Sequence, residues 1–77
     1  MTSSQAKLTG KPLSPREVQV IGMYGAGARS REIGDRLGIS KYTVLAHLCR
    51  IRAKLGARNL VNAAVIWERR GGGSQIS

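Results

Sequence analysis

Apolar residues recur every three or four positions through residues 13–70, the spacing of helices that bury one face. The longest such stripe predicts a helix over about Lys41–Leu55, and it consists of Val44, Leu48, Ile51 and Leu55. No stretch of the sequence shows the alternating β-branched residues that are typical of a strand. The pattern therefore predicts an all-α domain.

Residues that favour helix ends divide this domain into four predicted helices. The first opens with the capping box Ser14-Pro15-Arg16-Glu17, in which the serine is the N-cap and the glutamate lies at N3. Ser40 and Asn59 are the predicted N-caps of the third and fourth helices. Glycines follow the first three helices and allow the chain to turn. The first predicted helix begins at Pro15 and is stopped by Gly25 and Gly27, and the second begins near Ser30 and is stopped by Gly38. The third and fourth span about Lys41–Leu55 and about Leu60–Arg69.

The second and third predicted helices, joined by a short turn at Gly38, have the layout of a helix-turn-helix. Gly34 lies on the apolar side of the second helix, where the missing side chain would let another helix approach closely. Such a corner holds its second helix away from the rest of the domain, and a helix of that width fits the major groove of B-DNA. Helical hairpins in small bundles have similar spacing, so the motif needs support from the charges.

Length and composition limit the protein to one small domain. The chain has 77 residues, and residues 1–12 and 71–77 are predicted to be flexible tails around a folded unit at 13–70. No apolar run approaches the roughly 18–20 residues of a membrane span, and the start of the chain lacks the apolar region of a secretory signal. The single cysteine excludes an internal disulfide and favours a reducing compartment. One histidine and one cysteine cannot hold a structural zinc ion, so no metal or cofactor is expected.

Charge is the first positive indication of a partner. Thirteen basic and four acidic residues give a formal net charge of +9, of which +7 belongs to the predicted folded unit. Residues 40–58 contain five basic residues and no acidic one, whereas a merely solvated helix usually mixes both signs. This stretch is therefore predicted to bind phosphates, and the binding should weaken steeply with salt. The five residues are Lys41, Arg50, Arg52, Lys54 and Arg58.

The chain resembles the C-terminal DNA-binding domain of the LuxR/FixJ response regulators, the GerE-like helix-turn-helix. The resemblance runs without a gap from Leu13 to about Trp67. It implies a four-helix (tetrahelical) module that binds promoter DNA in the cytoplasm of a bacterium or of a phage-infected host, with the third helix in the major groove. It also implies a homodimer through the fourth helix, and a stand-alone member without a regulatory domain. The matching residues are Leu13-Ser14-Pro15-Arg16-Glu17, Gly27, Glu32-Ile33-Gly34, Leu37-Gly38-Ile39-Ser40, Thr43-Val44, His47, Ile51, Lys54-Leu55 and Ala63.

The resemblance also assigns roles to single residues. It implies that Thr43 and nearby basic groups contact the DNA backbone, while Leu45, Ala46 and Cys49 face the bases. Many family members have lysine or another polar donor at two of these three positions, whereas here all three lack a strong donor. They can touch thymine methyl groups but cannot make bidentate pairs with guanine or adenine. Base recognition would then fall to Lys41, Tyr42, Arg50 or DNA shape, or specificity would be low. The predicted DNA-contacting residues are Arg29, Ser30, Lys41, Tyr42, Thr43, Leu45, Ala46, His47, Cys49, Arg50, Lys54 and Arg58.

Several alternatives follow from the same residues. The apolar face of Leu45, Ala46 and Cys49 would also suit a protein-docking regulator that binds RNA polymerase or another transcription factor. Cys49 lies beside a basic residue and is a candidate redox switch. His47 makes either a structural hydrogen bond or a phosphate contact, and since no nucleophile or orienting partner accompanies it, no enzyme activity is expected. The predicted dimer residues Ala63, Ile66 and Trp67 are alternatively part of the core.

Overall fold

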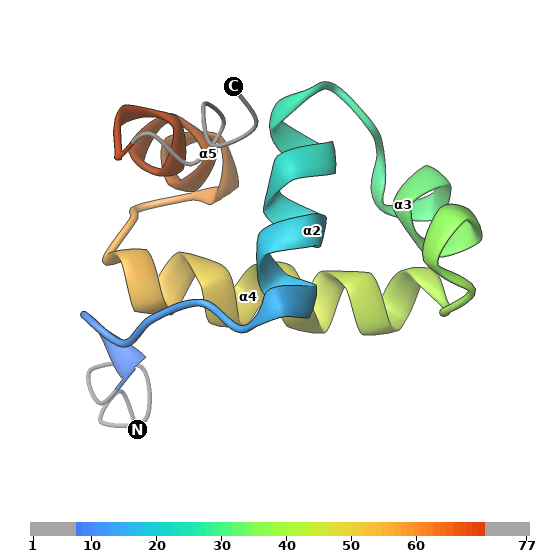
Figure 1. Cartoon of the computed structure of the whole chain (residues 1–77), viewed down its shortest axis with the longest axis horizontal. Coiled ribbons are helices and arrows are strands. Elements are labelled where there is room, and N and C mark those ends of the chain that lie inside the picture. The colour runs from blue at the N-terminus through green and yellow to red at the C-terminus, as the bar shows by residue number, and fades with distance from the viewer. Residues whose placement is uncertain (1–7, 71–77) are drawn as a thin grey trace.

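The structure is a computed structural model that describes residues 8–70 (Figure 1). This range holds four helices and no strand, so the predicted all-α, four-helix fold is confirmed. In Figure 1, α4 runs along one edge of the molecule, and the other three helices pack against it. Within residues 8–70, no helix combines the length and the apolar content that crossing a membrane requires. The helices are α2 (Pro15–Gly25), α3 (Ser30–Leu37), α4 (Lys41–Leu55) and α5 (Leu60–Arg69).

The core forms where the apolar faces of the four helices meet. The predicted stripe of α4 is confirmed, because its first three residues are fully buried and Leu55 is 7% exposed. Ala57, after the end of α4, also belongs to the core and was not predicted. This packing fixes the rotation of α4 about its axis and so decides which of its residues face outward. The other buried members of the cluster are Val20 and Ile21 of α2, Ile33 of α3 and Ala63 of α5.

The corner between α3 and α4 depends on two glycines. Gly38 has a positive φ of 73°, a conformation that a residue without a side chain adopts at little cost. Gly34 lies against the turn itself, since a Cβ added to it would be 2.6 Å from the carbonyl oxygen of Ile39. The close approach predicted at Gly34 is therefore real, but its neighbour is the backbone of the turn, residues 39–41, and not the face of another helix.

Replacing Gly34 with alanine is expected to lower the free energy of unfolding by about 1–3 kcal/mol, because the turn must move to admit the methyl group. Thermal or urea unfolding followed by circular dichroism measures this change. Gly22→Ala is the matched control, since Gly22 is also helical but an added Cβ would meet nothing within 4 Å. It should stabilise the protein by up to about 1 kcal/mol. Equal effects of the two substitutions would contradict the close packing at the turn.

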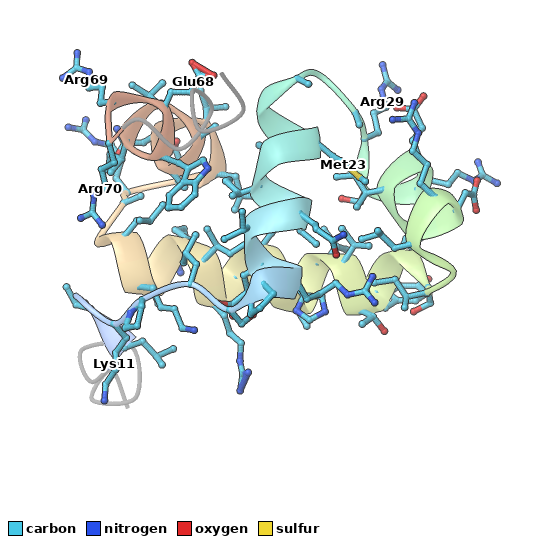
Figure 2. All side chains as sticks on the ribbon, viewed as in Figure 1. Lys11, Met23, Arg29, Glu68, Arg69 and Arg70 are labelled. Carbon is cyan, nitrogen blue, oxygen red and sulfur yellow. The ribbon has the colours of Figure 1, made fainter. Side chains whose placement is uncertain are left out.

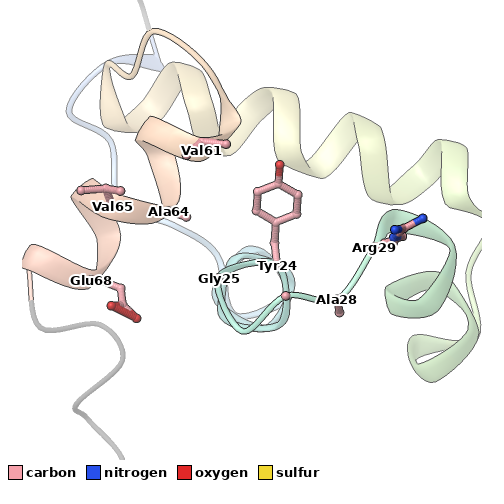
Figure 3. Close-up of a pocket in the computed structure, with 9 residues that line it drawn as sticks. Tyr24, Gly25, Ala28, Arg29, Val61, Ala64, Val65 and Glu68 are labelled. Atoms are coloured by element: carbon pink, nitrogen blue, oxygen red, sulfur yellow. The ribbon is translucent and has the colours of Figure 1, made fainter.

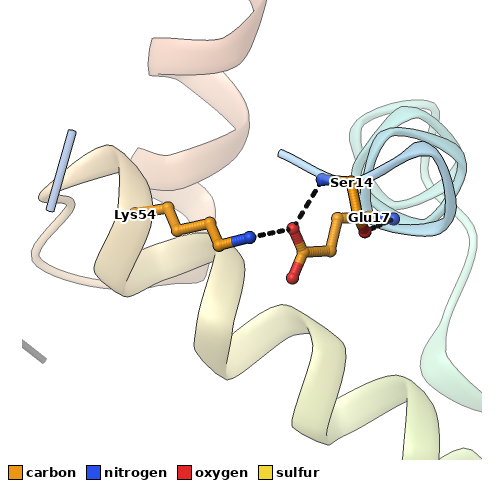
Figure 4. Close-up of polar contacts among 3 residues, drawn as sticks. All are labelled: Ser14, Glu17 and Lys54. Carbon is orange, nitrogen blue, oxygen red and sulfur yellow. Dashed lines mark hydrogen bonds and ion pairs between the residues drawn. The ribbon is translucent and has the colours of Figure 1, made fainter. Parts of the chain in front are cut away.

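A buried ion pair joins α2 to the end of α4 (Figure 4). The Lys54 Nζ and the backbone N–H of Ser14 both donate to the Glu17 Oε1, at 2.7 and 2.8 Å. The backbone N–H of Glu17 donates to the Ser14 Oγ at 3.2 Å, which confirms the predicted capping box. The Glu17 side chain is only 3% exposed and that of Lys54 14%. One carboxylate therefore begins α2 and also holds α4 in place.

The segment before α2 packs against the last turn of α4. The Thr9 hydroxyl donates to the carbonyl oxygen of Ala53 at 3.2 Å. The backbone N–H of Gly10 donates to the carbonyl oxygen of Lys54 at 2.9 Å. Both acceptors belong to the last turn of a helix, where carbonyl groups lack partners within the helix. The predicted tail over residues 1–12 is therefore too long at its end, because Thr9 and Gly10 are attached to the domain. Residues 1–7 and 71–77, which make up the rest of the predicted tails, lie outside the described residues.

Candidate nucleic-acid interface

One long side of α4 faces away from the core, and we call it the outer face. Its residues are Lys41, Tyr42, Thr43, Leu45, Ala46, Cys49 and Arg50, and all of them are exposed. Tyr42 is 71% exposed and Leu45 43%, so the face presents a large aromatic and a large aliphatic side chain to solvent. Because the buried stripe occupies the opposite side of the same helix, the outer face is turned outward along more than two turns. The structure thus brings seven of the twelve predicted DNA-contacting residues together on one surface.

The first turn of α4 is held in place by its cap. The backbone N–H of Thr43 donates to the Ser40 Oγ at 3.2 Å, and the two hydroxyl oxygens are 3.1 Å apart. The Lys41 Nζ lies 5.4 Å from the centre of the Tyr42 ring, within the range of a cation–π contact. These contacts place a hydroxyl, an ammonium group and an aromatic ring side by side at the start of α4, where the helix dipole adds positive potential.

The predicted basic residues of residues 40–58 have different surroundings. Lys41, Arg50 and Arg58 are exposed, and Arg52 is half-buried. Lys54 does not belong with the phosphate-binding residues, because its ammonium group is bonded to Glu17. The prediction that the basic residues of this stretch bind phosphates was therefore wrong at Lys54. Glu17 is distant in sequence, and it reaches α4 only because α2 crosses that helix.

The two residues predicted at the start of α3 are separate from the outer face. Ser30 is the first residue of α3, and its side chain does not cap the helix. The N-cap position belongs to Arg29, whose backbone N–H donates to the Glu32 Oε1 at 2.8 Å. Figure 2 shows the Arg29 side chain pointing away from the edge along which α4 runs. His47, one turn before Ile51, is half-buried at the border of the outer face.

The predicted dimer residues on α5 are mostly directed inward. Ala63 is fully buried, so it is not available for a dimer contact, and that assignment was wrong. Ala63 belongs instead to the core cluster. Ile66 and Trp67 are half-buried against the core. The exposed apolar residues of α5 are instead Val61 and Val65, at 67% and 44%.

These two valines line a hollow between α5 and the end of α2 (Figure 3). Tyr24 and Ala64 contribute to its lining, and Figure 3 shows Glu68 and Arg29 on opposite sides of it. Sequence reasoning missed this surface, although the spacing of four residues between Val61 and Val65 was a visible signal. The hollow gives the domain a second exposed apolar surface, separate from the outer face of α4.

Comparison with known proteins identifies the family of this helix-turn-helix domain. The family model for bacterial regulatory proteins of the luxR family matches residues 11–67. The transcriptional regulatory protein TdiR of Thauera aromatica is 47% identical over 47 residues, which cover 61% of this chain and 21% of TdiR. The C4-dicarboxylate transport transcriptional regulatory protein DctR of Rhodobacter capsulatus is 42% identical over 48 residues, covering 62% of this chain and 24% of DctR.

A longer but weaker similarity covers most of the chain. The uncharacterized transcriptional regulatory protein YxjL of Bacillus subtilis is 31% identical over 68 residues, which cover 88% of this chain and 31% of YxjL. The chain spans less than a third of the length of each of these three relatives. No solved structure matches the chain significantly. Since the match over residues 11–67 includes the helix-turn-helix and the whole outer face, the chain belongs to the luxR family of bacterial regulatory proteins, and its fold is that of a DNA-binding domain of transcription regulators.

Proposed function

We propose that the protein regulates transcription by placing α4 in the major groove of double-stranded DNA. The observation that carries this proposal is the outer face of α4, which is exposed, flanked by basic side chains and free of acidic residues along residues 40–58. A helix with its side chains is about 10–12 Å wide, and the major groove is about 12 Å wide. The partner is therefore a duplex, and the bases meet the centre of the outer face.

The DNA backbone is contacted by groups at the border of this face. Lys41 and Thr43 lie in the first turn of α4, whose amide groups and dipole suit a phosphate. Arg50 and Arg58 follow further along the chain, and His47 lies at the edge. Lys54 is excluded because Glu17 neutralises it. Binding therefore releases counterions from a few phosphates only. The slope of log affinity against log salt gives the number of phosphates that are contacted.

Arg50→Ala is expected to weaken duplex binding roughly tenfold at low salt, since a charge-assisted contact to a phosphate is lost. The slope of log affinity against log salt should also become shallower by about 0.9, the value for one phosphate. Fluorescence anisotropy over a series of salt concentrations measures both quantities. Arg69→Ala is the control, because Figure 2 shows Arg69 pointing outward from the far end of α5. If both variants bind alike, Arg50 does not contact the backbone.

A homodimer through α5 completes the proposal. Val61 and Val65 lie one turn apart and are exposed, so a two-fold axis beside them would bury the same apolar surface on both copies. These residues replace Ala63, which is fully buried. Two copies joined in this way carry two α4 helices to neighbouring half-sites on one face of the duplex.

Val65→Glu is expected to convert this dimer to a monomer, because two carboxylates would meet in an apolar contact. Sedimentation equilibrium over a range of protein concentrations gives the molecular mass. Gln19→Glu, on an exposed position of α2, makes the same change in charge away from α5 and should leave the mass unchanged. A wild-type mass that stays monomeric at every concentration would contradict the dimer.

A protein-docking role is the second candidate, and the exposed Leu45, Ala46 and Cys49 favour it. In that case the outer face of α4 binds RNA polymerase or another transcription factor. Such a regulator would show no steep salt dependence with a free duplex and no response to Arg50→Ala. We assign the protein to the bacterial cytoplasm, where its DNA target lies, and we expect no enzymatic activity.

A further inference from the structure

The outermost line of α4 carries few groups that pair strongly with a base. Tyr42, Ala46 and Cys49 follow one another at intervals of four and three residues, so they lie along one side of the helix. All three are exposed, and Leu45 stands beside them. Leucine and alanine have no polar side-chain atom, and a thiol is only a weak donor. Within this group, only the tyrosine hydroxyl can form a strong hydrogen bond.

This line ends where the N-terminal segment covers α4. Ala53 is the next residue on the same side, and it is only 7% exposed. Thr9 and Gly10, hydrogen-bonded to the carbonyl groups of residues 53 and 54, lie at this turn. A duplex that meets the outermost line therefore meets residues 42–49 and not the last turns of the helix.

The free energy of covering a base edge with these apolar side chains depends on which chemical groups the base presents in the major groove. Every base pair presents donors and acceptors there, and thymine alone adds an apolar group, its C5 methyl. A polar base edge covered by Leu45 or Ala46 loses water and gains no partner, which is unfavourable. When the same side chains cover a methyl group, apolar surface of both the methyl group and the side chains is removed from water, which is favourable.

We propose that the outermost line of α4 recognises the C5 methyl groups of thymine, so that the protein selects duplexes with thymine under Leu45, Ala46 and Cys49. This proposal rests on the proposed function, because α4 must lie in the groove. Lys41 and Arg50 flank the line and hold phosphates on either side of it. Base recognition then depends on apolar contact, and hydrogen bonds to the bases contribute little.

The test compares duplexes that differ only in this methyl group. The first pair is an alternating A·T duplex and the same duplex with uracil in place of thymine. The second pair is an alternating G·C duplex with cytosine or with 5-methylcytosine, which carries a methyl at the same place in the groove. With the full chain at low ionic strength, the methylated member of each pair should bind about fourfold more tightly for each methyl that touches α4, the ratio expected for burying one methyl group.

Variants locate the methyl contact on the protein. Leu45→Ala should reduce the thymine-to-uracil affinity ratio about threefold or more, since the largest apolar side chain of the line is removed. Leu45 is partly exposed, so the variant should fold. Gln19→Ala, at an exposed position of α2 outside both the outer face and the proposed dimer contact, should leave the ratio unchanged. A ratio that does not respond to Leu45→Ala would show that the methyl acts through duplex shape and would overturn the proposal.

Two further outcomes separate this inference from the proposed function. If the methylated and unmethylated members of each pair bind with equal affinity, methyl recognition is wrong while DNA binding stands. If no duplex binds even at low ionic strength, the proposed function fails and the inference falls with it. Weaker binding to duplexes with 7-deazaguanine, combined with indifference to uracil, would assign base recognition to a hydrogen-bonding residue such as Arg50 and would also overturn the proposal.

Discussion

Glu17→Gln is expected to lower the free energy of unfolding by about 3 kcal/mol, a large part of the roughly 5 kcal/mol typical of a small domain. The substitution leaves the ammonium group of Lys54 mostly buried beside a neutral amide. It also weakens the hydrogen bond that Glu17 accepts from the backbone of Ser14. Urea unfolding followed by circular dichroism at neutral pH measures the loss.

Glu32→Gln is the matched control for this prediction. Glu32 occupies the same N3 position of α3 and accepts the same kind of bond from the backbone N–H of Arg29, at 2.8 Å, but it is exposed. This variant should cost about 1 kcal/mol or less. The difference between the two variants isolates the ion pair, and equal losses would show that Lys54 adds nothing.

The contribution of Glu17 should also depend on pH. Burial, the largest single influence, raises the pKa of the carboxyl group, but hydrogen bonds from Lys54 and Ser14 and the charge of Lys54 together bring the pKa below its ordinary value of 4.5. A carboxyl group with a lowered pKa in the folded state adds stability above its unfolded-state pKa and loses it as the pH falls through the folded-state pKa. The stability difference between wild type and Glu17→Gln should therefore be full at neutral pH and shrink below pH 4.5. A difference that stays constant in acid would contradict this assignment.

Ala46→Asp is expected to weaken duplex binding more than about a hundredfold, because it places a carboxylate at the centre of the outer face, between two rows of phosphates. Ala46 is exposed, so the variant should fold, and circular dichroism checks this. Fluorescence anisotropy with a labelled duplex at low ionic strength measures the affinity. The result also tests orientation, since only a helix inside the groove brings this position close to the bases.

Ala26→Asp is the control for that measurement. It introduces the same side chain at an exposed position, at the end of α2 that Figure 1 shows farthest from α4. Its affinity for the duplex should fall only slightly, through the change in net charge. If the two variants bind equally well, α4 does not enter the groove.

Local signals in the sequence predicted the helices because each helix end depends on residues next to it. Ser40 as N-cap and Gly56 with a positive φ of 65° set the ends of α4, and both are recognisable from the sequence. The stripe of α4 then fixed which residues face outward. The outer face was therefore predictable, because one long helix has one clear apolar side.

Contacts between distant parts of the chain were not predictable in this way. Lys54 and Glu17 are 37 positions apart, and only the crossing of α2 and α4 brings them together. On α5, apolar residues occur on nearly every side, so their spacing does not orient the helix. Packing decided its orientation: Ala63 is fully buried in the core, and Val61 is left outside.

The attachment of Thr9 and Gly10 to α4 also governs how the protein can be handled. A fluorophore, tether or fusion partner joined ahead of Thr9 emerges beside the last turn of α4, the helix that we propose enters the major groove. A mechanical load applied through that junction reaches α4 before it reaches α2. A reporter of duplex occupancy is therefore best attached at this end of the molecule, and an inert anchor for immobilisation is best attached beyond α5.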